Sequence, residues 1–185
     1  MRSSQASRWS GAVVAAVLLG TGAASRADCV DDAAQYHLVN SWVLRAILWN
    51  ESGMKATAVN RNANGTVDVG IGQINSIHFG ALRDHGVSPD HLKNACVGTY
   101  VAAWHLKKQT IRYGNTWRAV GAYHSVTPHF NQSYANRVHA TLVRWRAIAP
   151  GPPPFPRVAP PPAAAHPSVT LRQANASPLS ALAGD

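Results

Sequence analysis

The only glutamate of the 185-residue chain lies in the stretch Ser41-Trp42-Val43-Leu44-Arg45-Ala46-Ile47-Leu48-Trp49-Asn50-Glu51-Ser52-Gly53. Leu44 and Ile47 recur at the spacing of one helix face, and Glu51 falls on the same face as Leu44. Gly53 is a residue type that commonly follows the end of a helix. The pattern therefore predicts a helix over residues 41–52 whose last turn carries a glutamate on the apolar side.

Two effects act on a carboxyl at the position of Glu51. The C-terminal end of a helix carries partial negative charge, and apolar neighbours exclude water, so both effects disfavour the charged form and raise the pKa. A carboxylic acid that stays protonated near neutral pH is what general acid catalysis requires. The alternative is a helix-end glutamate whose carboxyl bends into solvent.

The first 27 residues have the features of a secretory signal. Arg2 and Arg8 give a positive start, residues 11–22 form an apolar stretch, and Ser25-Arg26-Ala27 offers small residues at the positions before a cut. The apolar run is short for a membrane span. We therefore expect cleavage after Ala27, a periplasmic location, and no stable membrane insertion afterwards; the alternative is an uncleaved anchor.

An exported chain starting at Asp28 contains two cysteines, Cys29 and Cys96. Paired cysteines are usual in exported proteins, so the sequence predicts a disulfide between them. The bridge would join the N-terminus to the segment before Val97. The alternative is a pair of free, buried thiols.

The formal net charge is +9. Three arginines and no acidic residue precede Asp28, which leaves +6 after cleavage. A basic exported protein suits an anionic partner such as cell-wall peptide carboxylates or lipid headgroups, and the alternative is that the charge serves solubility alone. The chain has no dense Lys/Arg run or zinc-finger spacing, so no nucleic-acid partner is expected. Its nine histidines form no metal-binding motif, so we expect neither a metal nor another cofactor.

Apolar content of 46% suffices for one packed domain. Asn64-Gly65 is typical of a two-residue hairpin turn, followed by a strand over residues 66–69. The proline-rich composition from Pro150 indicates an extended linker or disordered tail over residues 150–185. We expect a mainly α domain with a small β-hairpin over residues 28–149. Its helices are expected at 31–38, 41–52, 77–85, 95–113, 116–123 and 129–148.

The predicted hairpin carries a second carboxylate, Asp68, seventeen residues after Glu51. Alternation along the strand places Thr66 and Asp68 on the same face. A helix end followed by a hairpin can bring two carboxyls to opposite sides of a cleft, which is the usual apparatus for cleaving glycosidic bonds. The alternative is an aspartate that accepts hydrogen bonds from turn amides.

Three short motifs follow one another behind the signal sequence, Glu51-Ser52, Gly70-Ile71-Gly72-Gln73-Ile74-Asn75 and Ala122-Tyr123-His124. In this order and spacing they resemble the soluble lytic transglycosylase family of the lysozyme superfamily. Within that family the chain is similar to the small enzymes that accompany type III and type IV secretion or conjugation machines. The resemblance covers about residues 29–148. The motifs are Glu51-Ser52 for the catalytic Glu-Ser, Gly70-Ile71-Gly72-Gln73-Ile74-Asn75 for Gly-Leu-Met-Gln-Ile-Asn, and Ala122-Tyr123-His124 for Ala-Tyr-Asn.

The resemblance implies a lysozyme-like α+β domain that acts on peptidoglycan with Glu51 as the acid. Gln73 and Asn75 would offer amides to acetamido groups, and Tyr123 a hydroxyl and a ring face. The alternative is that Gln73 and Asn75 only hold the hairpin together. The full set of substrate-binding candidates is Ser52, Gln73, Asn75, Tyr123, His124 and Tyr134.

Two residues depart from the family pattern. Gly72 replaces a methionine that lines the sugar groove, so we expect a locally looser strand and altered subsite affinity. His124 replaces an asparagine and can hydrogen-bond or titrate. Tyr134 matches a family tyrosine in the last core helix, where its hydroxyl faces the cleft or serves the core only. The tryptophans are expected in the core, with Trp49, close to Glu51, as the candidate exception.

Three functions remain open from the sequence. The first is a periplasmic lytic transglycosylase that opens peptidoglycan for a secretion or conjugation apparatus, whose components would be its partners. The second is a hydrolytic muramidase that uses Glu51 and Asp68. The third is a non-catalytic peptidoglycan-binding assembly factor that recruits partners through its proline-rich tail.

Overall fold

Helix α2 (Ser41–Ser52) has the predicted bounds in the computed structural model, which describes residues 28–156. The Asn40 side chain accepts a hydrogen bond from the Val43 amide (3.0 Å) and begins the helix. Gly53 ends it in a left-handed conformation with φ 61°. Leu44 and Ile47 are fully buried, so the apolar stripe read from the sequence faces the core as predicted.

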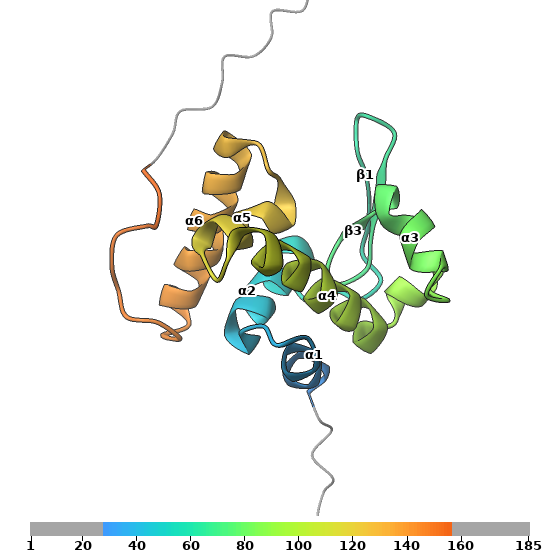
Figure 1. The fold of residues 1–185 in the computed structure, drawn as a ribbon, viewed down its shortest axis with the longest axis horizontal. Coiled ribbons are helices and arrows are strands. Elements are labelled where there is room, and N and C mark those ends of the chain that lie inside the picture. Colours follow the sequence, from blue (N-terminus) through green and yellow to red (C-terminus); the bar gives the residue numbers. More distant parts are fainter. Residues whose placement is uncertain (1–27, 157–185) are drawn as a thin grey trace, which may run out of the picture.

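The fold is mainly helical with one small antiparallel sheet, which confirms the predicted fold class (Figure 1). The predicted signal at residues 1–27 and the tail beyond residue 156 lie outside the described residues. No helix among residues 28–156 is long and apolar enough to cross a membrane. The remaining elements are α1 (Cys29–His37), β1 (Val59–Arg61), β2 (Val67–Val69), β3 (Ile74–Asn75), η1 (Ser76–His78), α3 (Phe79–Arg83), η2 (His91–Lys93), α4 (Ala95–Tyr113), α5 (Trp117–His124) and α6 (Pro128–Arg144).

The sheet has the strand order β1-β2-β3. The prediction of a two-residue turn between its first two strands is wrong. The Asn62 amide donates to the Thr66 carbonyl (2.8 Å) and the Gly65 amide to the Asn62 carbonyl (3.0 Å), which leaves a three-residue loop. Gly65 has φ 83°, the left-handed conformation that such a loop needs. The two-residue strand β3 was not predicted, because two residues are too few to show the alternation of apolar and polar side chains that indicates a strand.

Two predicted helices end earlier in the structure. The region expected as one helix over 77–85 starts as the 3₁₀ turn η1 and continues as α3, which ends at Arg83. Helix α6 ends at Arg144 rather than at residue 148, and Arg146 follows with φ 58°, which breaks the helical path.

The start of the proline-rich segment is held against α6, contrary to the expectation of a linker or disordered tail from residue 150. The Asn136 side chain donates to the Phe155 carbonyl (2.9 Å) and accepts from the Phe155 amide (3.1 Å). Figure 1 shows this segment running back along α6 on the side away from the sheet. The described domain therefore extends to residue 156.

The core lies between α2, α4, α5 and α6. Tyr134, Val138 and Leu142 of α6 are at most 1% exposed. Gly121 lets α5 approach α6 closely, since a Cβ there would lie 2.4 Å from the Asn131 carbonyl oxygen. A smaller apolar cluster under the sheet consists of Val69, Ile74, Leu82, Leu92 and Val101. These two clusters fix the end of α2 relative to the sheet.

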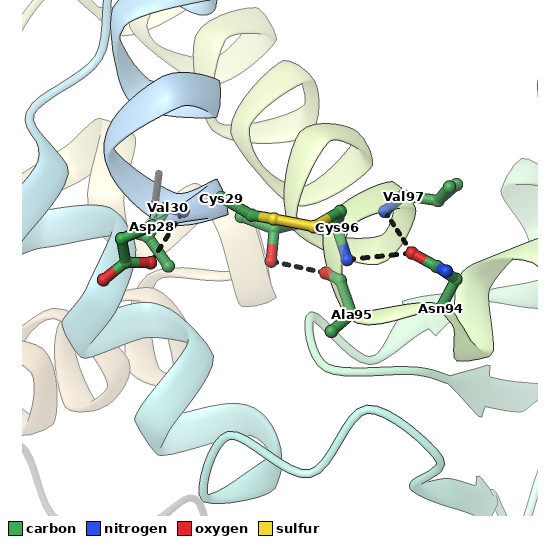
Figure 2. The surroundings of a disulfide bond; sticks show 8 residues. Asp28, Cys29, Val30, Asn94, Ala95, Cys96 and Val97 are labelled. Carbon is green, nitrogen blue, oxygen red and sulfur yellow. Dashed lines mark hydrogen bonds between the residues drawn. A yellow bond between two sulfur atoms is a disulfide. The ribbon is translucent and has the colours of Figure 1, made fainter. Parts of the chain in front are cut away.

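Cys29 and Cys96 form the predicted disulfide, with their Cα atoms 5.3 Å apart (Figure 2). Cys29 is the first residue of α1 and Cys96 lies in the first turn of α4. The Asn94 side chain begins α4 by accepting hydrogen bonds from the amides of Cys96 (3.0 Å) and Val97 (3.1 Å). The bridge thus joins two helix starts, and neither cysteine lines the cleft described below.

Candidate active site

A cleft of about 620 Å³ opens between the end of α2, the sheet and the end of α5. The β1–β2 hairpin supplies nearly half of its polar lining residues. In Figure 1 the hairpin stands opposite α5 and α6. The cleft is lined by Glu51, Asn60, Arg61, Asn62, Asn64, Thr66, Asp68, Gln73, Ile74, Asn75, Ile77, His78, His105, Tyr123 and His124.

Glu51 lies where the last turn of α2 meets this cleft. Its Oε1 is buried without a hydrogen bond of regular geometry, while the residue as a whole is partly exposed. Loss of hydration raises the pKa of Glu51 from its ordinary value of 4.5 to about 7. The charge of Asp68 contributes to the rise, and Tyr134 and Arg137 oppose it. The expectation of a raised pKa on an apolar helix face is confirmed.

Tyr134, on α6, is 1% exposed, and its buried hydroxyl also lacks a hydrogen bond of regular geometry. The hydroxyl is nevertheless near enough to Glu51 to favour the charged carboxylate. His124 stacks on the Tyr134 ring, with centroids 5.0 Å apart and an interplanar angle of 5°. The Arg137 guanidinium lies 5.2 Å from the same centroid. Tyr134 therefore connects the acid to two basic side chains.

His124 remains exposed to solvent where it lines the cleft. Loss of hydration among the cleft walls and then the Arg137 charge lower its pKa, while Asp68 raises it. The neutral imidazole is therefore favoured near pH 7, and it can both donate and accept a hydrogen bond.

Asp68 lines the cleft with Glu51, and its β2 position pairs with Asn60 and Asn75 on the flanking strands. Both carboxylate oxygens accept amide hydrogen bonds, Oδ2 from Asn62 (2.8 Å) and Oδ1 from Asn75 (2.7 Å). Asp68 thus fixes the hairpin, the alternative considered from the sequence, while still contributing charge to the cleft.

Gln73 and Asn75 line the cleft, but their amides have partners within the protein. The Gln73 side chain donates to the Gly70 carbonyl (2.8 Å) and accepts from Asn60 (2.6 Å). The side-chain oxygen Oδ1 of Asn75 accepts from the Ile77 backbone amide (3.1 Å). These contacts match the alternative in which both residues hold the hairpin, and substrate binding by either amide remains a prediction.

Ser52 is not among the residues that line the cleft. Its hydroxyl hydrogen-bonds to the Ile71 carbonyl (2.8 Å) and lies 3.4 Å from the Leu48 carbonyl. The contact ties the end of α2 to the loop before β3. Ser52 therefore positions the neighbouring Glu51 relative to the sheet.

The expectation of a looser chain at Gly72 is wrong. Gly72 is buried, and a Cβ there would lie 2.7 Å from the Ala102 Cβ and 2.8 Å from the Tyr123 hydroxyl. The Tyr123 hydroxyl donates to the Gly72 carbonyl (2.8 Å). Tyr123 therefore reaches the backbone where a larger side chain would collide, and the proton of its hydroxyl is already donated within the protein although the residue lines the cleft.

Sequence reasoning did not identify His78 and His105, which also line the cleft. Their ring centroids are 4.8 Å apart, and the His105 ring is 4.9 Å from that of Tyr123. His105 Nε2 lies 3.2 Å from the Tyr123 carbonyl and acts as the donor, since a carbonyl only accepts. Burial lowers the pKa of His105 to about 4. Nothing local distinguishes these histidines from surface ones, because the tertiary fold brings them together.

Trp49, the tryptophan expected near the acid, is not a cleft residue. It packs against Trp145 with ring centroids 5.9 Å apart and is 44% exposed. Among residues 28–156 no group of three or more His, Cys, Asp or Glu side chains is arranged to hold a metal ion.

A helical domain whose buried acid ends a helix and faces a small antiparallel sheet has the lysozyme-like architecture. The family model of the transglycosylase SLT domain matches residues 28–140, and the chain belongs to this family. The resemblance inferred from the three sequence motifs is thereby confirmed.

Curated relatives include three small bacterial proteins. Protein IpgF of Shigella flexneri is 43% identical over 103 residues, which is 55% of this chain and 68% of that protein. Invasion protein IagB of Salmonella typhimurium strain SL1344 is 38% identical over 102 residues, 55% of this chain and 64% of its own length. An X polypeptide of Escherichia coli is 34% identical over 105 residues, 56% of this chain and 62% of its own length.

Proposed function

We propose that this protein is a peptidoglycan lytic transglycosylase that cleaves the β-1,4 bond between N-acetylmuramic acid and N-acetylglucosamine. The observation that carries the proposal is Glu51, a carboxylic acid with a pKa of about 7 at the wall of an open, polar cleft. Such a group is protonated often enough near neutral pH to act as a general acid. Membership in the SLT family supports peptidoglycan as the substrate class and a transglycosylase type of reaction.

In the proposed reaction Glu51 donates its proton to the bridging oxygen, and the N-acetylglucosamine side leaves as an alcohol. Positive charge develops on the muramic acid ring and is stabilised by the acetamido group of the substrate. The Glu51 carboxylate then takes the proton of the C6 hydroxyl, whose oxygen closes the 1,6-anhydro ring. Water is not consumed, and the carboxyl returns to its protonated form.

A hydrolytic muramidase is the second candidate, because Asp68 shares the cleft with Glu51. A second catalytic carboxylate would need to act on the sugar or on a water molecule. Asp68 is already held by the amides of Asn62 and Asn75. These contacts favour the transglycosylase reading, in which Asp68 positions the hairpin and tunes the acid.

The relative named Invasion protein IagB supports a further part of the proposal. We infer that this protein opens the cell wall locally for a secretion or conjugation apparatus, after export to the periplasm. The cleft with its intact acid argues against the third hypothesis, a factor that only binds peptidoglycan.

Substitution of the acid tests this function. Glu51→Gln keeps the shape of the side chain and removes its proton-transfer chemistry, so lysis of purified peptidoglycan is expected to fall on the order of a hundredfold or more. Asp68→Asn is expected to retain partial activity. Lysis by Glu51→Gln at the wild-type rate would refute the assignment of the acid, and near-complete loss in Asp68→Asn would favour the muramidase.

A further inference from the structure

A second groove of about 620 Å³ lies between α6 and residues 151–156. We call it the α6 groove. Figure 1 shows the chain after α6 folding back along the side of the helix that faces away from the sheet. The polar and basic lining residues are Ser133, Asn136, Arg137, His139 and Arg144, and Pro153 and Pro156 belong to the opposite wall.

The wall formed by residues 151–156 is held in place by one side chain. Asn136 makes two hydrogen bonds to the backbone of Phe155, one to its carbonyl (2.9 Å) and one from its amide (3.1 Å). Prolines restrict the backbone of this segment. A wall that is fixed before binding reduces the entropy lost when a ligand enters.

The groove lies in a part of the chain that contains no acidic residue. Ten of the seventeen Lys and Arg residues fall within residues 91–184, which include no Asp or Glu. Neither Arg137 nor Arg144 takes part in a salt bridge within residues 28–156. An anionic ligand therefore meets two arginines that are not held in a salt bridge.

Arg137 links the groove to the catalytic cleft electrostatically, because its charge acts on Glu51 and His124, which line that cleft. This residue lines the groove, and its guanidinium also lies 5.2 Å from the centre of the Tyr134 ring. Arg144 follows seven residues later on the same helix, which is about 10 Å along the axis. An extended peptide covers that distance in roughly three residues.

We propose that the α6 groove binds the peptide that peptidoglycan carries on its N-acetylmuramic acid residues, with Arg137 and Arg144 contacting its carboxylates. The inference rests on the proposed function. That peptide is attached to the sugar on which Glu51 would act, and Arg137 is a groove residue whose charge reaches Glu51. An acidic segment of another protein would match the charge equally, but nothing would require it to bind beside a residue whose charge acts on the catalytic acid.

The test compares two substrates that differ only in the peptide. Peptide-bearing glycan strands and the same strands stripped by an amidase are digested by the protein comprising residues 28–185. Arg144→Glu is expected to lower kcat/KM roughly tenfold on peptide-bearing strands, because a charge-assisted contact becomes a repulsion. The rate on stripped strands is expected to stay unchanged. Arg112→Glu, an equal charge change at an exposed α4 position outside the groove, serves as the matched control.

A second variant tests the wall. Asn136→Ala releases Phe155 and is expected to lower kcat/KM on peptide-bearing strands in the same direction as Arg144→Glu. Thermal unfolding checks that each variant is folded. The free tetrapeptide L-Ala-D-Glu-diaminopimelate-D-Ala, titrated by calorimetry, gives a readout that needs no turnover, and Arg144→Glu is expected to weaken its binding about tenfold.

An equal fall in kcat/KM on both substrates, or the same fall in Arg112→Glu, would overturn the inference. It would indicate a general electrostatic attraction between the basic protein and its substrate. Unchanged kinetics in Arg144→Glu and Asn136→Ala would also overturn it and would point to an acidic protein partner. If the wild-type protein cleaves neither substrate, the proposed function fails. The calorimetric titration then decides separately whether the groove binds the peptide.

Discussion

Removing Glu51, the proposed catalytic acid, is expected to stabilise the protein at alkaline pH. The folded state raises the pKa of Glu51 from 4.5 to about 7, so between these values the folded protein binds more protons than the unfolded chain. Stability from this group is complete below pH 4.5 and is lost as the pH rises through 7. The shift predicts that the wild-type protein loses about 2 kcal/mol between pH 5 and pH 8, with allowance for the water that reaches the cleft.

Glu51→Gln cannot ionise and is expected to escape this loss. Its free energy of unfolding relative to the wild type should therefore rise by about 2 kcal/mol from pH 5 to pH 8. Urea denaturation of both proteins at the two pH values measures the difference, and the shared titration of other groups cancels. Asp84→Asn, at an exposed position outside the cleft, is the control. If the difference in unfolding free energy between Glu51→Gln and the wild type is the same at pH 5 and pH 8, the conclusion that folding raises the pKa of Glu51 is refuted.

Three further outcomes are expected. The kcat/KM for lysis should fall as the pH rises through about 7, and Asp68→Asn should move this limb to lower pH because Asp68 raises the pKa of Glu51; a pH–rate profile flat from 6 to 9 would contradict this. Burial lowers the pKa of His105 from 6.5 to about 4, so the stability it contributes is lost as the pH falls through that range. His105→Gln should reduce the loss of unfolding free energy between pH 7 and 4.5 by about 2 kcal/mol in urea titrations. Reduction of the Cys29–Cys96 bond, which spans 67 residues, should lower stability by about 2–4 kcal/mol, and free thiols in protein purified from the periplasm would contradict the bridge.

The helices that carry the site could be predicted because their signals are local. The stripe of Leu44 and Ile47 on α2, together with Gly53, defined that helix and placed Glu51 on its buried face. The bounds of α4 were likewise set by its apolar run and by Gly114. A raised pKa for Glu51 follows from those facts alone, since burial is its main cause.

Other features depend on contacts between residues far apart in sequence. Tyr123 reaches the Gly72 carbonyl across 51 residues, so crowding at Gly72 carries no local signal. His105 is buried by its packing against α5 and η1, which a helical pattern does not reveal. Proline-rich composition excludes helix after residue 150, but it does not show that Asn136 binds the Phe155 backbone. The sequence therefore indicated the acid more readily than the walls around it.

Mass spectrometry of the fragments released from purified peptidoglycan by the wild-type protein tests the central claim most directly. The account predicts fragments ending in 1,6-anhydro-N-acetylmuramic acid, which are one water lighter, about 18 Da, than hydrolysed ends. It also predicts that Glu51→Gln releases none of them. Predominantly reducing N-acetylmuramic acid ends in the wild-type digest would contradict the transglycosylase and establish a muramidase in its place.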